Sequence, residues 1–540
     1  MANSCTRSSR WLRAGVALLA AGVLAACSTS PSTPGTAEKA QASDVTKTYK
    51  AGLVGVSEGG TPVKGGTLTY AAMAETPVLD PAKVIYSAST GGIEMSAVFD
   101  VLMRWDSATG ELEPQLAKSL ESSDDFTTWT LTLRDGVKFS DGTPLNSDAV
   151  IWSIQRYLTM KGTESALWGR NVTSMKASGD STVVFKLKDK WPGFANLLAS
   201  GPGLIVAKAS DGKDAFKPIG AGPFVFERYA PHEELLLKAN ENYWDGRPNL
   251  DAVRMVWLND PKASRESLDA GSVSMTLLRQ PDAVEKALAD GLPGYLNLVT
   301  LTSQPIINAT EGRPGHDVRV RQAVQLAIDP KLIYQRVYKG AGTPTGEIFS
   351  AASRWHTDAK PLPYDPAKAK QLVEEAKKDG WNGKIKYLGS QDPTSRDMSL
   401  TIKAALDSVG FEVEVETART VQDILTKVAV ERDYDMAGYG ITLRESDPYP
   451  RMFAALHSQG TLTNGVHTGP EMDAVIDEFK AASTKEEQLK AMAKFQEQWN
   501  KDVPAPVFGP INEYLAWSKK VHGIVDSATS VVLLGKAWVE

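Results

Sequence analysis

Cysteine is nearly absent from this chain. Cys5 and Cys27 are the two cysteines among 540 residues, so residues 28–540 contain no thiol. A disulfide framework is therefore excluded, and stability has to come from a buried core. The composition, with 42% hydrophobic and 23% charged residues, is that of an ordinary globular protein long enough for more than one core.

The apolar run near the start is too short to cross a membrane. It extends from Ala14 to Ala26, far below the ~20 residues that a spanning helix needs. Three arginines precede it, namely Arg7, Arg10 and Arg13. This order of a basic start, an apolar run and small residues predicts a secretory signal over residues 1–26.

A lipid attachment site follows this signal. Leu24-Ala25-Ala26-Cys27 matches a lipobox, in which small residues admit the signal peptidase and the cysteine thiol takes a diacylglycerol. The prediction is a lipidated Cys27 that holds the mature protein on the membrane surface. The alternative is an ordinary cleaved signal with a cysteine at the junction.

Acidic residues outnumber basic ones. The chain has 65 acidic and 59 basic residues, and loss of the three signal arginines leaves 56 basic residues and a net charge of −9. An acidic surface argues against nucleic acid as a partner and against electrostatic binding to anionic lipid. Residues 28–63 are rich in Ser, Thr, Pro, Gly and Ala, so residues 27–63 are predicted to be a flexible tether that spans roughly 30 Å.

Motifs for catalysis and metal binding are scarce. The six histidines have no H-E-x-x-H spacing, and His457 and His467, ten residues apart, are either ligands of a metal chelate or ordinary surface histidines. No G-x-x-x-x-G-K loop occurs, so an ATPase has to be a separate chain. Gly55-Val56-Ser57-Glu58-Gly59 fits the nucleophile pattern of hydrolases, but that pattern requires a strained strand-to-helix turn rather than a tether. We predict a protein that is not an enzyme, with no catalytic residue, no resident metal and no cofactor.

Periodic patterns predict a mixture of strands and helices. Trp129, Leu131 and Leu133 alternate with threonines, which predicts a strand with one apolar face. Asp135-Gly136 and Asp141-Gly142 predict turns, and Asn146 or Ser147 is placed to cap a helix with apolar residues at helical spacing. This stretch predicts a small α+β unit.

The second half predicts helices that alternate with strands. Asp317 is placed to cap a helix that ends before Asp329-Pro330, with Arg319, Arg321 and Gln322 off its apolar stripe. Gly469-Pro470 begins another helix, and a further helix with Leu489, Met492, Phe495 and Trp499 follows. Strand-like runs such as Phe411 to Val415 lie between helices, which indicates an α/β organisation.

These segments, in this order, resemble the extracellular solute-binding family that serves peptide, dipeptide and nickel importers. The likeness covers nearly all of the chain after the tether, and many separate segments in register make it specific. The residues that carry it are Leu79-Asp80-Pro81, Glu113-Pro114-Gln115-Leu116-Ala117, Trp129 to Leu133, Arg134 to Gly142, Asp148-Ala149-Val150, Gly220-Ala221-Gly222-Pro223-Phe224, Asn242-Tyr243-Trp244, Val318 to Ala323, Ala327-Ile328-Asp329 and Tyr364 to Ala369.

The resemblance implies an α/β, bilobed fold that closes on its ligand, with an extra α+β subdomain inserted in the first lobe. By that resemblance, residues 64–100, 215–305 and 505–540 form lobe I. Residues 101–214 form its inserted subdomain, and residues 306–504 form lobe II. The crossings near 305 and 505 would be the hinge.

The resemblance also directs attention to one stretch of lobe II. In peptide-binding relatives an acidic side chain shortly before an Asp-Pro receives the amino terminus of the ligand, because a buried ammonium needs a charge partner. Here Thr442 or Arg444 falls near that position, before Asp447-Pro448.

Three interpretations of this stretch stay open. Glu445 or Asp447 takes an ammonium while Arg444 clamps a carboxylate; or Arg444 faces the pocket and the ligand is more anionic; or these are solvated loop charges and Asp447 caps the next helix. Tyr86, Trp191, Trp355 and Tyr439 are aromatic candidates for stacking on ligand.

Three functions therefore remain. The leading one is a monomeric, lipid-anchored receptor that captures peptides outside the cytoplasm and delivers them to ABC permease subunits with separate ATPase subunits. The second is a receptor for a metal chelate or another small solute, and the third is a secreted hydrolase.

Overall fold

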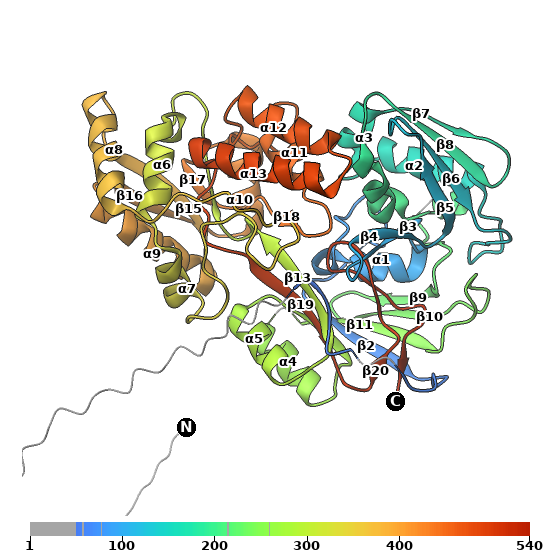
Figure 1. Cartoon of the computed structure of the whole chain (residues 1–540). Helices are drawn as coiled ribbons and strands as arrows, with labels where there is room; N and C mark the ends of the chain where they lie inside the picture. Colours follow the sequence, from blue (N-terminus) through green and yellow to red (C-terminus); the bar gives the residue numbers. More distant parts are fainter. Residues whose placement is uncertain (1–49, 57–58, 77, 213–214, 259) are drawn as a thin grey trace, which may run out of the picture. The chain divides into compact units, whose positions relative to one another are not determined.

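The structure is a computed structural model that describes residues 50–540 except 57–58, 77, 213–214 and 259. The predicted signal, Cys27, most of the tether and Ser57 lie outside the described residues. In the part of the chain that is described, no helix combines the length and the apolarity that crossing a bilayer requires. Helices and sheets alternate as the α/β prediction expects (Figure 1).

The largest sheet takes its strands from distant parts of the chain. Its spatial order is β1 (Gly52–Val54), β13 (Gly294–Thr300), β19 (Ile511–Trp517), β12 (Met275–Leu278), β2 (Thr67–Ala72), β11 (Ala252–Trp257), β10 (Glu234–Ala239) and β9 (Phe224–Ala230), with β18 (Leu443–Arg444) also paired to β13. Strand β2 is parallel to β11 and β12, and the other pairs are antiparallel. The chain therefore returns to this sheet after building the rest of the fold.

Both faces of this sheet are covered. Tyr70 and the next residue, Ala71, point to opposite faces and join different apolar clusters. One cluster includes α1 (Gly92–Phe99) and the other includes α4 (Pro261–Asp269) and α5 (Pro281–Ala289). The remaining elements of this part are η1 (Ala88–Thr90), β20 (Val521–His522), β21 (Val525–Asp526), β22 (Val532–Leu533) and β23 (Trp538–Val539).

Strand β1 corrects the tether prediction. It lies within residues 27–63 and pairs antiparallel with β13, Gly52 opposite Leu296. Its central residue Leu53 is 41% exposed, and the strand is held by its backbone pairing with β13 and by the contact of Val54 with an apolar cluster. A composition argument that counts apolar residues does not detect such a strand.

A four-stranded antiparallel sheet with two helices follows α1. The sheet has the order β5 (Ala117–Ser122), β6 (Thr128–Leu133), β8 (Thr182–Leu187) and β7 (Val172–Ala177), and beside it lie β3 (Met103–Asp106), β4 (Glu111–Pro114), α2 (Ser147–Thr159), α3 (Ser165–Asn171), η2 (Pro192–Ala199), η3 (Gly201–Gly203) and η4 (Lys208–Ser210). The predicted alternation in β6 is confirmed, because Trp129, Leu131 and Leu133 are all buried. The Asn146 side chain caps α2 by accepting from Ala149 N at 3.0 Å.

The second half contains a smaller, mixed sheet surrounded by helices. The sheet order is β14 (Pro305–Ile307), β17 (Met436–Gly438), β15 (Lys384–Ser390) and β16 (Glu412–Ala418). The helices are η5 (Pro314–His316), α6 (Val318–Ala327), α7 (Pro330–Val337), α8 (Pro366–Lys378), α9 (Pro393–Ser408), α10 (Val421–Leu425), the π-helical η6 (Thr426–Glu431), α11 (Tyr449–Leu456), α12 (Pro470–Ala481) and α13 (Lys485–Asp502).

The predicted helices of this half are confirmed in α6, α12 and α13. Asp317 caps α6 by accepting from Arg319 N at 2.9 Å. Arg321 lies off the apolar stripe but is buried, because its guanidinium donates to the carbonyls of Gly315 and His316. The boundaries of the lobes given above remain predictions.

Candidate functional site

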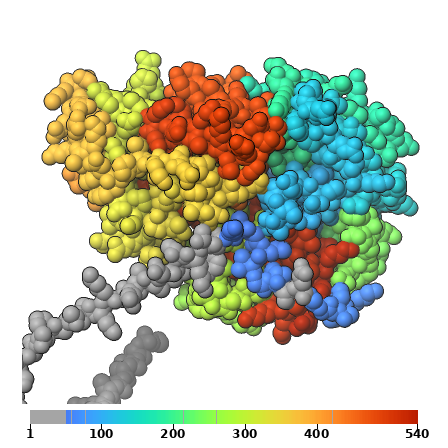
Figure 2. All heavy atoms as spheres, in the orientation of Figure 1, coloured from blue at the N-terminus to red at the C-terminus, as the bar shows by residue number. Residues whose placement is uncertain are grey.

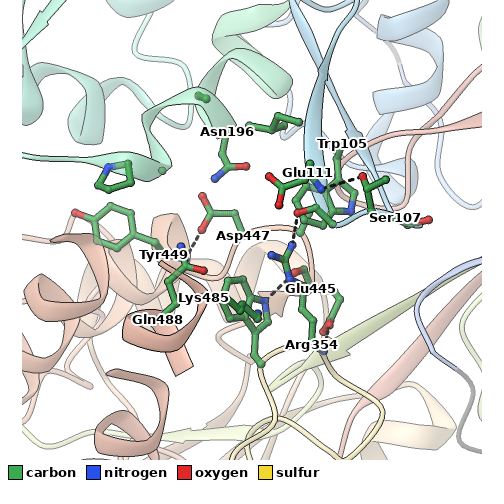
Figure 3. A pocket seen from close by; sticks show the side chains of 18 of the residues that line it. Trp105, Ser107, Glu111, Asn196, Arg354, Glu445, Asp447, Tyr449, Lys485 and Gln488 are labelled. Atoms are coloured by element: carbon green, nitrogen blue, oxygen red, sulfur yellow. Dashed lines mark hydrogen bonds between the residues drawn. The ribbon is translucent and has the colours of Figure 1, made fainter. Parts of the chain in front are cut away.

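Two cavities are each lined by segments that lie far apart in the chain. Residues before about 200 form one side, and residues of the second half of the chain form most of the other. The large chamber, about 850 Å³, is lined by Trp105 and Asn196 on one side and by Arg354, Asp447 and Lys485 on the other (Figure 3). The small chamber, about 330 Å³, is lined by side chains that include Ser87, Arg279, Arg444, Arg451 and Thr529. Asn196, Ser446 and Asp447 line both chambers, so these residues form the wall between them.

Several contacts bridge the two sides of this cleft. Arg354 donates to Gly110 O at 3.1 Å, Lys190 Nζ donates to Ser483 Oγ at 3.0 Å, and Lys480 Nζ donates to Asn171 Oδ1 at 2.5 Å. On the face shown in Figure 2, the orange-red surface of α11, α12 and α13 abuts the cyan and teal surface of the segments that carry α2 and α3. Segments from both halves of the chain therefore line the chambers.

Arg354 is the central cation of the large chamber. Its guanidinium lies 4.5 Å from the centre of the Trp105 ring and 4.6 Å from that of Trp355. Lys485 Nζ lies 3.9 Å from the centre of the Trp355 ring. Burial, followed by repulsion from Arg354, lowers the pKa of Lys485 to about 8. Cations against aromatic faces in an enclosed space suit the recognition of anionic or aromatic groups.

Asp447 lies in the wall with half of its carboxylate unused. Its Oδ1 accepts from Tyr449 N at 3.0 Å, at the start of α11. Its buried Oδ2 has no hydrogen-bond partner among the described residues, and the Asn196 amide faces it across the chamber (Figure 3). Burial raises the pKa of Asp447 to about 7. The Asn196 amide partly offsets this effect of burial, so a ligand that reaches this oxygen would compete with Asn196 for it.

Both carboxylate oxygens of Glu445 accept hydrogen bonds from other residues of the protein. Its Oε2 accepts from Ser353 Oγ at 2.8 Å, its Oε1 accepts from Arg354 N, and its carbonyl accepts from Trp355 Nε1 at 2.8 Å. Burial raises the pKa of this carboxyl. Glu445 thus fixes the loop that carries Arg354 and Trp355.

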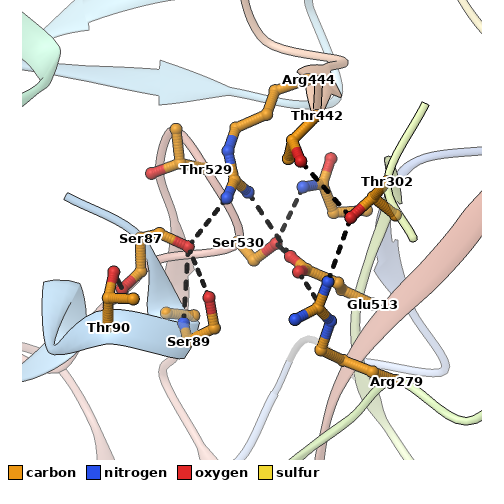
Figure 4. Close-up of polar contacts among 12 residues, drawn as sticks. Ser87, Ser89, Thr90, Arg279, Thr302, Thr442, Arg444, Glu513, Thr529 and Ser530 are labelled. Atoms are coloured by element: carbon orange, nitrogen blue, oxygen red, sulfur yellow. Dashed lines mark hydrogen bonds and ion pairs between the residues drawn. The ribbon is translucent and has the colours of Figure 1, made fainter. Parts of the chain in front are cut away.

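Arg444 lies at the end of β18 and faces the small chamber (Figure 4). Its guanidinium donates to Ser87 Oγ at 3.1 Å and lies 3.5 Å from Glu513 Oε2. Glu513 also pairs with Arg279 at 3.2 Å. Burial alone would raise the pKa of Glu513, but the guanidiniums of Arg444 and Arg279 hold it below its usual value. Burial lowers the pKa of Arg444.

The structure gathers most of the candidate residues at the two chambers. Trp191, Trp355 and Glu445 line the large chamber, Tyr86, Thr442 and Arg444 line the small one, and Asp447 lines both. Residues 444–447 are not freely solvated loop charges, because Glu445 is buried and Arg444 and Asp447 are partly buried. The expectation that Asp447 caps the next helix agrees with the bond to Tyr449 N.

Two of the aromatic candidates make contacts within the protein. Tyr86 is buried, and its hydroxyl is hydrogen-bonded to Ser96 Oγ at 2.8 Å. Tyr439 packs against the core and is not among the residues that line either chamber. Thr442 has a left-handed backbone with φ of 66°, which is a strained conformation for a β-branched residue beside a cavity.

Sequence reasoning missed several lining residues. Trp105, Asn196, Arg354, Arg451 and Lys485 come from five separate segments. The only local signal is that Arg354 precedes Trp355, which is a candidate. Their convergence depends on the packing of the two halves, which no spacing in the sequence reveals.

The histidine pair does not form a metal centre in the described part of the chain. His467 Nε2 lies 3.1 Å from Asp473 Oδ1, and His457 Nε2 lies 3.6 Å from Asp477 Oδ2. Among the described residues, no group of three or more His, Cys, Asp and Glu side chains is arranged to hold a metal ion. These histidines lie beside acidic residues of α12 instead.

Comparisons with known proteins agree with this geometry. A family model described as bacterial extracellular solute-binding proteins, family 5 Middle, matches residues 111–463. Heme-binding protein A of Haemophilus influenzae is 28% identical over 83% of this chain and 87% of that protein. Oligopeptide-binding protein AppA of Bacillus subtilis is 24% identical over 96% of both chains.

Solved structures show the same fold. AppA in complex with a nonapeptide superposes with a TM-score of 0.74 at 22% identity, covering 89% of this chain and 100% of AppA. NikA from Brucella suis in complex with Fe(III)-EDTA superposes with a TM-score of 0.73 at 20% identity, covering 88% of this chain and 100% of NikA. At these identities the likeness establishes the fold, and the predicted two-lobed α/β class is confirmed.

Proposed function

This chain belongs to the bacterial extracellular solute-binding proteins of family 5, and on that premise we propose that it is the receptor that captures peptides for an ABC importer. The family is one of binding proteins rather than enzymes, and it acts outside the cytoplasm. The peptide is held between the two halves of the chain and passed to permease subunits, which work with separate ATPase subunits.

The cleft that contains the two chambers is the observation that supports this proposal. Together the chambers provide aromatic surface, cations and an unused carboxylate oxygen within one continuous wall. The large chamber lies within the several-hundred to ~1,000 Å³ range of small-molecule sites. A peptide offers what such a site needs, namely apolar side chains, backbone N–H and C=O groups and charged ends.

Calorimetry on ligand-stripped protein tests the proposal. The protein is unfolded to release bound material, refolded, and titrated with pools of synthetic di- to nonapeptides. We expect saturable heat with at least one pool, and intact peptides on recovery by mass spectrometry. Accumulation of shortened peptides that depends on Ser57 would instead support the hydrolase, with Ser57→Ala as its control.

A receptor for an anionic metal chelate is the second candidate. The cations of the large chamber, Arg354, Lys480 and Lys485, favour it, and NikA binds Fe(III)-EDTA in the same fold. Titration with Fe(III)-EDTA and with a nickel–histidine complex separates the two functions. Heat with a chelate and none with any peptide pool would replace the peptide function with this one.

The membrane contact is the lipid on Cys27. A lipobox cysteine after a short apolar signal supports it, and so does a family that works outside the cytoplasm. The tether would then leave the monomeric receptor free to reach its permease.

A further inference from the structure

The small chamber gathers three guanidiniums from separate elements. Arg279 follows β12, Arg444 ends β18 and Arg451 belongs to α11. Figure 4 shows Arg279 and Arg444 reaching Glu513 from different directions. The Glu513 carboxylate therefore forms ion pairs with both guanidiniums, at 3.2 Å to Arg279 and 3.5 Å to Arg444.

Arg451 is held by a backbone carbonyl rather than by a carboxylate in the part of the chain that the structure describes. Its Nε donates to Ile441 O at 3.0 Å, and within the described residues its guanidinium takes part in no ion pair. Burial, followed by repulsion from Arg444, lowers the pKa of Arg451. A cation that is mostly removed from water without a counter-charge is costly, and a bound anion would offset that cost.

The other carboxyl near this cation is already engaged. Glu164 lines the chamber, but it accepts a hydrogen bond from the Tyr157 hydroxyl, and burial raises its pKa. Asp447, in the wall, also has a raised pKa. Glu164 favours the charge of Arg451, but its effect is smaller than the opposing effects of burial and of Arg444.

The rest of the lining suits a carboxylate on an apolar stem. Ser89, Thr90 and Thr529 also line the chamber (Figure 4). The hydroxyls of Thr90 and Thr529 donate to the carbonyls of Ile85 and Tyr86, at 2.5 and 2.9 Å, and their oxygens add polar surface. Leu197, Phe453 and other apolar side chains surround the remainder. Guanidiniums form charge-assisted hydrogen bonds with carboxylates, and two of them at one cavity suit the recognition of such a group.

We propose that the small chamber binds a carboxylate of the peptide through Arg444 and Arg451, while the ligand chain passes Asp447 and continues into the large chamber. This inference rests on the proposed peptide function and adds the direction of the ligand in the cleft. The free Oδ2 of Asp447 accepts a backbone N–H of the ligand as it crosses the wall. The aromatic side chains of the large chamber then contact the rest of the peptide.

Three forms of one peptide pool test the inference by calorimetry. The first form has free carboxyl termini and no acidic side chains, the second has amidated termini, and the third has amidated termini and one aspartate. We expect amidation to weaken binding at least ~10-fold, the order expected for losing a charge-assisted contact of ~1.5–3 kcal/mol. If aspartate restores binding, the carboxylate can come from a side chain; if it does not, the chamber requires the terminal carboxylate.

Two variants connect the effect to the chamber. The first variant is Arg451→Gln, which should fold normally because it leaves both ion pairs of Glu513 intact. The second variant is Arg444→Gln, which removes one of these ion pairs. Both should weaken binding of the free-acid pool about 10-fold and leave binding of the amidated pool unchanged. Arg247→Gln is the matched control, because Arg247 pairs with Glu241 and Asp251 and lines neither chamber.

The outcomes separate the inference from the function on which it rests. Equal binding of the free-acid and amidated pools overturns the inference and leaves the peptide function standing. Absence of heat with every pool overturns the peptide function, and the inference falls with it. Loss of discrimination in both chamber variants, with the control unchanged, supports both.

Discussion

Buried carboxyl groups show how far the fold shifts the charge of single residues. Glu94 is 1% exposed in the first turn of α1, where Thr76 Oγ1 donates to its Oε1 at 3.4 Å. Its Oε2 has no hydrogen-bond partner in the described part of the chain. Burial raises the pKa of Glu94 to about 7. Glu94 lines neither chamber, so its titration affects stability rather than binding.

Replacement of Glu94 should change how stability depends on pH. Because its folded pKa is raised, the folded state holds this proton more tightly, and the stabilisation present at low pH is lost as pH rises through about 7. Glu94→Gln cannot ionise, so it should avoid a loss of about 2 kcal/mol in unfolding free energy between pH 5 and pH 8. Urea unfolding at several pH values measures this difference.

Glu374→Gln is the matched control, since Glu374 is exposed on α8. Its unfolding free energy should follow that of the parent protein at every pH. A Glu94→Gln variant that loses stability with pH as steeply as the parent would show that Glu94 is already ionised at neutral pH.

At the scale of elements, the β3–β4 hairpin is the part of the first half that contacts Arg354. Trp105 of β3 lies against the guanidinium, and Gly110, between the strands, accepts its hydrogen bond. On the other side, Glu445 holds the loop of residues 353–355 in place. The Arg354 side chain therefore contacts the β3–β4 hairpin directly. This contact can form only when the segments that carry the two groups are packed together.

Loss of the Trp105 ring should speed ligand release. A desolvated cation–π contact contributes about 2 kcal/mol, so Trp105→Leu should raise the dissociation rate of a bound fluorescent peptide by up to about 30-fold, as measured by stopped flow. Trp381→Leu is the control, because Trp381 packs on Phe411 within the second half. That variant should lose stability without faster release, and equal release rates for Trp105→Leu and the parent protein would remove the hairpin from the account of ligand retention.

At the scale of the whole molecule, attachment and capture are separate tasks. The folded part has an acidic sequence, and the predicted lipid on Cys27 is the expected membrane contact. Cys27→Ser should therefore move the protein from the membrane fraction to the soluble fraction while leaving peptide binding unchanged. Fractionation followed by immunoblotting measures the shift, and continued retention on membranes would disprove a lipid anchor at this position.

Local patterns anticipated elements better than they anticipated the site. The strand at 128–133, the Asn146 and Asp317 caps and the helix that begins at Pro470 depend on neighbours within a few residues, and all are present. Strand β1 was missed because its partner β13 lies far along the chain. Seven of the eight candidate ligand residues line a chamber. The sequence did not show that both carboxylate oxygens of Glu445 are hydrogen-bonded within the protein, whereas Asp447 Oδ2 forms no hydrogen bond with the described residues.

The sequence by itself determined the family, the fold class and the expectation of a secreted, lipid-carrying protein, because these depend on local order along the chain. Only the tertiary structure decided which charges are buried and paired. Arg444, Glu513 and Arg279 meet through β18, β19 and the end of β12, and Arg354 contacts a tryptophan almost 250 positions earlier. Such contacts arise from the packing of both halves around a shared interior, and burial then sets the charge of each group.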